Sequence, residues 1–96
     1  MMDKMKKGDR EAILKGLFHM GAIFRMNGAA FAVIHRIDDG EVAARLRELT
    51  KDPVTLDGYS VSDFAFAAMD LLGLSQYRGE KEAVKRLIES NFDFLR

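Results

Sequence analysis

The chain has 96 residues, with 15 basic residues, 15 acidic residues and no cysteine. This length predicts one domain with a modest core, and the balanced charge argues against a dedicated nucleic-acid binder, which usually carries a basic surplus. No apolar run approaches the roughly 20 residues that span a bilayer, so we expect no membrane contact. The lack of cysteine fits a reducing compartment, and we expect a cytoplasmic location.

Proline occurs once, at Pro53, while alanine, leucine, methionine and charged residues are frequent. This composition favours helices. We predict an all-α fold of four to five helices. Residues 1–8 are basic and lack a following apolar stretch, which predicts a flexible N-terminal tail rather than a signal peptide. Residues 9–96 are expected to form a single helical domain.

The first predicted helix begins at Asp9, which is a suitable N-cap. Ile13, Leu17, Met20 and Phe24 recur at helical spacing, so they predict one buried stripe. Asn27-Gly28 is expected to end this helix, with Gly28 in the left-handed conformation. The alternative is a β-hairpin around Asn27-Gly28, with strands at residues 22–26 and 29–34.

Residues 29–37 fit either a short helix or a strand, and their helical neighbours favour the helix. Asp38-Asp39-Gly40 predicts a break and a cap before a helix over residues 41–52, in which Val42, Leu46 and Leu49 face one way. Glu41 and Arg45 are spaced to form an ion pair on its flank. Asp52-Pro53 stops this helix, and residues 54–60 predict a loop with a glycine-centred turn.

Residues 61–73, VSDFAFAAMDLLG, predict a helix that other helices surround, because apolar side chains cover much of its circumference. Ser60 or Ser62 is the expected N-cap of this helix, and Gly73 is expected to end it. The small side chains of Ala65 and Ala68 would let a neighbouring helix approach closely. A last helix is expected in the C-terminal segment, with a stripe of Val84, Leu87, Ile88 and Leu95 and a flanking pair of Glu82 and Arg86.

Residues 61–73 resemble the second helix of a HEAT-like repeat at Val61, Ala65, Ala68, Leu72 and Gly73, and Asp52-Pro53 resembles the usual end of the first helix. Ser62 stands where the family usually has the arginine of an Asp-Arg ladder, which implies an irregular pair of helices rather than a regular array. The loop at residues 54–60 would be an insertion. A weaker resemblance covers residues 9–21.

The resemblance implies a non-catalytic scaffold or protein-protein interaction module. About three repeats are normally needed to cover each other's apolar sides, so a chain with roughly two is expected to self-associate or to bind a protein partner. Second helices of such repeats line the surface that partners contact. The candidate contact face therefore comprises Glu11, Lys15, Phe18, Arg25, Asp63, Phe66 and Asp70.

We expect no catalytic residue, cofactor or metal. Two other classes stay open. A small ligand-binding or metal-binding bundle, or an enzyme, would use His35, Asp38 and Asp39. A nucleic-acid-linked regulator would need a basic face made of Lys6, Lys7, Arg10, Lys15 and Arg25, and the neutral net charge argues against it.

Overall fold

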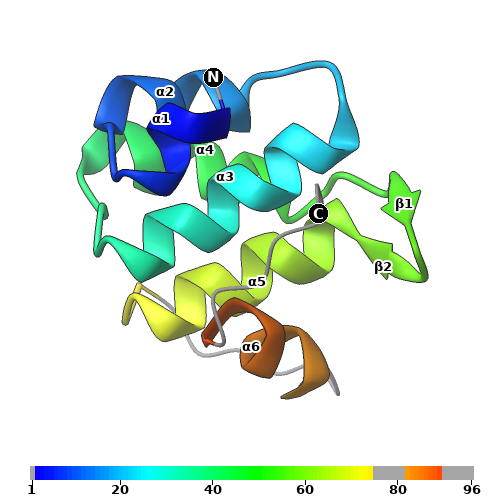
Figure 1. The fold of residues 1–96 in the computed structure, drawn as a ribbon. Helices are drawn as coiled ribbons and strands as arrows, with labels where there is room; N and C mark the ends of the chain where they lie inside the picture. Colours follow the sequence, from blue (N-terminus) through cyan, green and yellow to red (C-terminus); the bar gives the residue numbers. More distant parts are fainter. Residues whose placement is uncertain (1, 75–81, 90–96) are drawn as a thin grey trace.

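Helix α3 (Ala22–Ile34) lies in the middle of the molecule, and the other helices are arranged around it (Figure 1). The computed structural model describes residues 2–74 and 82–89. These residues form six helices and one antiparallel two-stranded sheet, which confirms the predicted all-α class. The other elements are α1 (Met2–Lys6), α2 (Arg10–Leu17), α4 (Gly40–Leu49), β1 (Thr55–Leu56), β2 (Tyr59–Ser60), α5 (Val61–Leu71) and α6 (Glu82–Glu89).

Every residue of α3 from Arg25 to Val33 is buried, so this helix has no solvent-facing stripe in that stretch. The predicted helix end at Asn27-Gly28 is wrong, and so is the alternative hairpin. Gly28 lies in mid-helix, where an added Cβ would be 3.1 Å from the backbone nitrogen of Leu17. Glycine at this position therefore lets α2 approach α3 closely, and that packing outweighs its low helix propensity.

The chain breaks instead between Phe18 and Gly21. Ile13 and Leu17 are fully buried on α2, but the helix ends at Leu17, and Gly21 is the N-cap of α3. The prediction that Met20 continues the buried stripe is wrong, because Met20 is 93% exposed. A periodic pattern that runs through a break assigns the residues beyond it to the wrong side.

The segment from α4 to α5 follows the sequence more closely. Asp39 caps α4, since its carboxylate accepts a hydrogen bond from the Val42 N–H at 3.2 Å. The expected glycine-centred turn is present at Asp57-Gly58, with φ values of 54° and 82°. Positive φ at both turn residues matches the twist of a two-residue hairpin, so the predicted loop contains a short β-hairpin.

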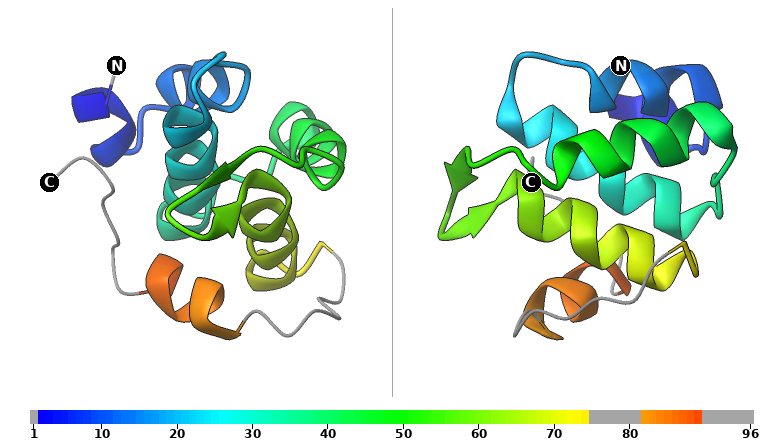
Figure 2. Two further views of the ribbon diagram at one scale, coloured as in Figure 1. Left: turned by 90° about the vertical axis from the view of Figure 1, so that its right-hand side faces the viewer. Right: turned by 180° about the vertical axis from the view of Figure 1, so that it is seen from behind.

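Helix α5 is the surrounded helix that the sequence predicts. Ser60 caps it through a reciprocal capping box with Asp63, and Gly73 with φ of 74° follows its end. Ala65 and Ala68 are fully buried. The helix packs against α3, α4 and α6 (Figure 2), so small side chains do lie where neighbouring helices approach.

Both ends of the described chain pack on this core. Residues 2–6, where the sequence suggests a tail, form α1, and Met5 is fully buried against Gly16 of α2. On α6, Val84 and Ile88 are fully buried as expected. Leu95 and the side chain of Glu82, and with it the expected pair with Arg86, lie outside the described residues. None of the helices within the described ranges is long and apolar enough to cross a membrane.

Candidate functional site

The residues of the predicted contact face do not gather on one surface. Glu11, Lys15 and Phe18 are exposed on α2 and at its end, whereas Asp63, Phe66 and Asp70 lie on α5. Helices α2 and α5 pack on α3 from different sides (Figure 2). On α5, Phe66 is 41% exposed, while Asp70 is partly covered because its carboxylate lies 2.6 Å from Nζ of Lys85 on α6.

The assignment of Arg25 to an exposed face is wrong, because this side chain is buried and holds three segments together. Its Nε donates to the carboxylate of Asp52 at 2.9 Å, and the two side chains are 9% and 17% exposed. Its Nη1 donates to the carbonyl oxygens of His19 at 2.8 Å and Met20 at 2.6 Å. Arg25 thus joins α3, the α2–α3 loop and the segment after α4.

Three large apolar side chains are exposed at the end of α2, in the α2–α3 loop and in the segment before β1, and we call them the end patch: Phe18, Met20 and Val54. They are 57%, 93% and 45% exposed, respectively. The Met20 carbonyl is bound by Arg25, and the Val54 N–H donates to Asp52 at 3.1 Å. The α2–α3 loop and the β-hairpin lie at the same end of the molecule (Figures 1 and 2).

Phe18 is held in place by α4. The guanidinium carbon of Arg45 lies 4.4 Å from the centre of the Phe18 ring, within the range of a cation–π contact. Arg45 also donates to the Leu17 carbonyl at 3.0 Å and lies 3.6 Å from Glu48. Instead of the expected ion pair between Glu41 and Arg45, Arg45 binds Leu17 and Glu48, and Glu41 binds Arg10.

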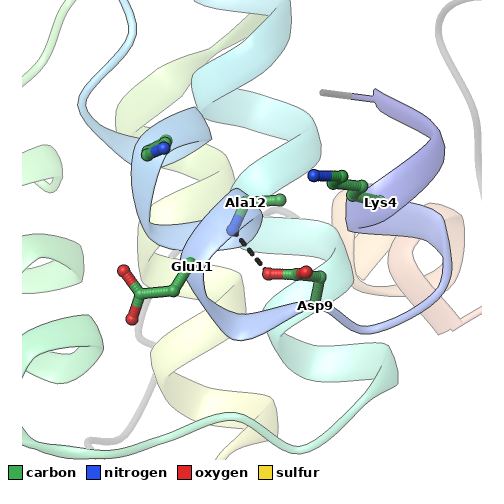
Figure 3. Close-up of a pocket in the computed structure, with 5 residues that line it drawn as sticks. Lys4, Asp9, Glu11 and Ala12 are labelled. Carbon is green, nitrogen blue, oxygen red and sulfur yellow. Dashed lines mark hydrogen bonds between the residues drawn. The ribbon is translucent and has the colours of Figure 1, made fainter.

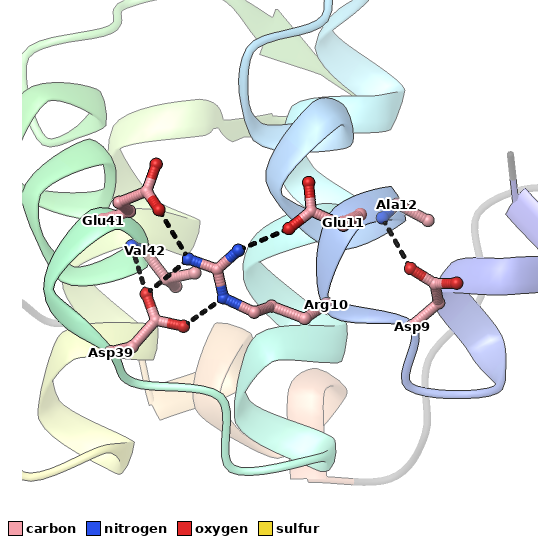
Figure 4. A network of polar contacts seen from close by, with 7 residues as sticks. All are labelled: Asp9, Arg10, Glu11, Ala12, Asp39, Glu41 and Val42. Atoms are coloured by element: carbon pink, nitrogen blue, oxygen red, sulfur yellow. Dashed lines mark hydrogen bonds and ion pairs between the residues drawn. The ribbon is translucent and has the colours of Figure 1, made fainter.

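Glu41 instead belongs to a charged network that joins the starts of α2 and α4 (Figure 4). The guanidinium of Arg10 donates to both oxygens of Asp39, to Glu41 at 2.8 Å and to Glu11 at 2.6 Å. The hydrogen bonds from Arg10, followed by the one from the Val42 backbone, lower the pKa of the Asp39 carboxyl. The carboxylates in turn raise the pKa of Arg10. This arrangement fixes α2 relative to α4.

A surface pocket of about 340 Å³ lies between α1 and α2 (Figure 3). Its walls are Lys4, Asp9, Glu11, Ala12 and Lys15. The Asp9 carboxylate already accepts the Ala12 N–H at 3.0 Å as the cap of α2. These five residues include side chains of both charge signs.

The alternative site at His35, Asp38 and Asp39 does not converge. His35 Nε2 lies 2.9 Å from the Lys6 carbonyl, and Asp39 is bound by Arg10. Within the described part of the chain, no group of three or more potential ligands is placed to hold a metal ion.

The alternative basic face is also not assembled. Lys6, Lys7 and Lys15 are exposed, but Arg25 is buried and Arg10 is bound by three carboxylates. Two of the five cations are thus already neutralised within the fold.

Sequence reasoning missed two members of the end patch. The helical spacing places Met20 on a buried stripe, and Val54 lies in a connection without periodicity. The usable signal was the pair of large apolar residues on either side of His19, next to a glycine that starts a new helix.

Together, the fold and these contacts define a small all-α domain that exposes Phe18, Met20 and Val54. Comparison of the chain with protein-family models, with curated proteins and with solved structures finds no match.

Proposed function

We propose that this chain is a non-catalytic protein-protein interaction module that docks through the end patch. The observation that carries the proposal is the exposure of Phe18, Met20 and Val54 on loops held by a buried ion pair. Large apolar groups on a surface mark contact sites when they cluster. Because Arg25 and Asp52 fix the loops beforehand, docking loses less conformational entropy than it would with mobile loops.

The composition of the end patch also suits a protein contact. Aromatic residues, methionine and arginine are enriched at protein interfaces, and Phe18 stacked on Arg45 combines two of these types. Met20 is unbranched and adaptable, so it can fill an irregular surface on a partner.

The occupant that we propose is a second copy of this chain. Full burial of one such side chain stabilises by about 1.5–3 kcal/mol, so one patch alone offers a few kcal/mol. Association costs at least about 4 kcal/mol in lost freedom of motion. A symmetric contact buries the exposed apolar side chains of both copies against each other. The formal net charge of zero leaves no long-range repulsion between copies.

The HEAT-like resemblance of residues 41–73 is part of this proposal. The packing of α4 against α5, with Ala65 and Ala68 buried, supports a helical pair of that type. The β-hairpin would be an insertion between the two helices, and Ser62 leaves the pair without the family's usual arginine. A cytoplasmic location fits the absence of cysteine.

The proposal is tested by sedimentation equilibrium of the wild-type chain and of Met20→Glu over a range of concentrations. We expect the wild-type mass to rise toward that of a dimer, while Met20→Glu stays monomeric because docking would bury an unpaired charge. Lys4→Gln is the matched control, since it makes the same change in net charge on exposed α1, outside the end patch. A wild-type chain that stays monomeric, or equal association of all three chains, would contradict docking of a second copy.

A further inference from the structure

His19 lies between two residues of the end patch, and its side chain makes a hydrogen bond within the α2–α3 loop. Its Nδ1 atom accepts a hydrogen bond from the Gly21 N–H at 2.9 Å, and its ring contacts Phe24 in a tilted arrangement, with 4.2 Å between ring centres and 41° between ring planes. A backbone N–H can only donate, so Nδ1 must present a lone pair. The observed loop therefore requires a neutral imidazole with its proton on Nε2.

The charged side chains on the elements that pack around His19 are Arg25, Arg45 and Asp52. Gly21 is the N-cap of α3, whose start carries partial positive charge. Arg25 of α3 binds the His19 carbonyl, and Arg45 of α4 binds the neighbouring Leu17 carbonyl. Asp52, in the segment after α4, is the carboxylate on this side and is already bound by Arg25.

We infer that His19 is a pH-sensitive latch on the end patch. Neutral His19 holds residues 18–21 in the conformation that presents Phe18 and Met20. Protonation at Nδ1 places an N–H against the Gly21 N–H, which breaks this hydrogen bond and loosens the turn at residues 19–21, while Arg25 still binds the carbonyl oxygens of His19 and Met20. Acidification opens the latch, because a histidine ring that carries a proton on Nδ1 can no longer accept the Gly21 N–H. The consequence for docking rests on the proposed function, whereas the latch itself does not.

The latch is tested at the Gly21 amide by ¹⁵N NMR and hydrogen exchange at about pH 8 and about pH 5. In the wild-type chain we expect the Gly21 signal to shift and its protection factor to fall on acidification. In His19→Asn, the asparagine oxygen accepts the same N–H two residues ahead and does not titrate. This variant should keep both the signal position and the protection at the lower pH.

His35→Asn is the matched control, because it removes the other histidine and leaves the loop untouched. It should retain the wild-type response at Gly21. A Gly21 response that persists in His19→Asn, or one that is absent from the wild-type chain, would overturn the latch.

Docking is read separately by sedimentation at the same two pH values. We expect the wild-type dimer to dissociate at the lower pH and the His19→Asn dimer to persist. A wild-type dimer that is equally stable at both pH values would overturn control of docking by the latch. A wild-type chain that is monomeric at both would overturn the proposed function, and the Gly21 response would still decide whether the latch exists.

Discussion

At the residue scale, Asp52 accepts a hydrogen bond from the Val54 N–H and one from Arg25, which in turn binds the α2–α3 loop. We predict that Asp52→Ala destabilises the fold by about 3 kcal/mol, because it leaves the buried Arg25 guanidinium without its carboxylate. The free energy of unfolding measured in urea gives this value. The hydrogen bonds from Arg25 to the α2–α3 loop should also weaken, because the Arg25 side chain is no longer held by the Asp52 carboxylate.

Glu48→Ala is the control for this prediction, since it also removes a carboxylate beside an arginine. Glu48 is 64% exposed and lies 3.6 Å from Arg45, so its removal should cost less than about 1 kcal/mol. Equal losses in the two variants would show that the Arg25–Asp52 pair is no more important than a surface pair.

Asp39 should make stability depend on pH at the acid end. Its ordinary pKa is 3.8, and the hydrogen bonds from Arg10 lower it in the folded chain. A carboxyl whose pKa is lower in the folded state contributes stability above its ordinary pKa, and this contribution is lost as the pH falls through the lower folded value. We therefore predict that the folded chain loses stability below about pH 4 as Asp39 becomes protonated.

The measurement is a carboxyl titration by NMR with urea unfolding at matched pH values. Arg10→Gln should return the pKa of Asp39 toward its ordinary value and flatten the acid dependence of the unfolding free energy. An unchanged Asp39 titration in Arg10→Gln would contradict the assignment of the shift to Arg10.

At the scale of elements, the contact between α2 and α3 depends on Gly28. We predict that Gly28→Ala destabilises the chain by about 1–2 kcal/mol, because the added methyl group overpacks the site against the Leu17 backbone. The cost of overpacking therefore exceeds the roughly 1 kcal/mol of helix propensity that alanine gains over glycine. Thermal or urea unfolding gives the comparison.

Gly40→Ala supplies the opposite case. Gly40 begins α4, and no atom lies within 4 Å of its added Cβ, so alanine should stabilise by up to about 1 kcal/mol. If both alanine variants were more stable than the wild-type chain, the close approach of α2 to α3 would not be what requires glycine at position 28.

The elements that could be predicted from sequence are those with local signals that agree with packing. Asp39 caps α4, Ser60 caps α5 and Gly73 follows its end, because each serves its own helix. Asn27-Gly28 is an equally local turn signal, but α3 continues through it, because Gly28 is needed for the close contact with Leu17. The Asn27 side chain donates to the Ile23 carbonyl at 2.8 Å, one helical turn earlier.

The candidate site was less predictable than the helices. Phe18 of the predicted contact face is exposed, but Arg25 of the same face is buried. Sequence spacing gives the direction of a side chain only while the helix continues, and the break after Leu17 removed that information. The partner of Arg25 lies 27 residues away at Asp52, a separation that no periodic pattern reveals.

At the scale of the whole molecule, the end patch lies at one end of a domain whose other large apolar groups, within the described residues, are mostly buried. A contact between identical patches has twofold symmetry and closes on itself. We therefore expect association to stop at two copies rather than to continue into larger assemblies. Masses well above a dimer would indicate contact between different surfaces.

Methionine methyl NMR of the wild-type chain tests docking through the end patch most directly, because exposed Met20 and fully buried Met5 and Met26 report separately. As the concentration increases, the Met20 methyl signal should shift in step with formation of the dimer, while the Met5 and Met26 signals stay in place. A Met20 signal that stays unchanged at concentrations where the mass has doubled, or at every concentration reached, would contradict docking through this surface.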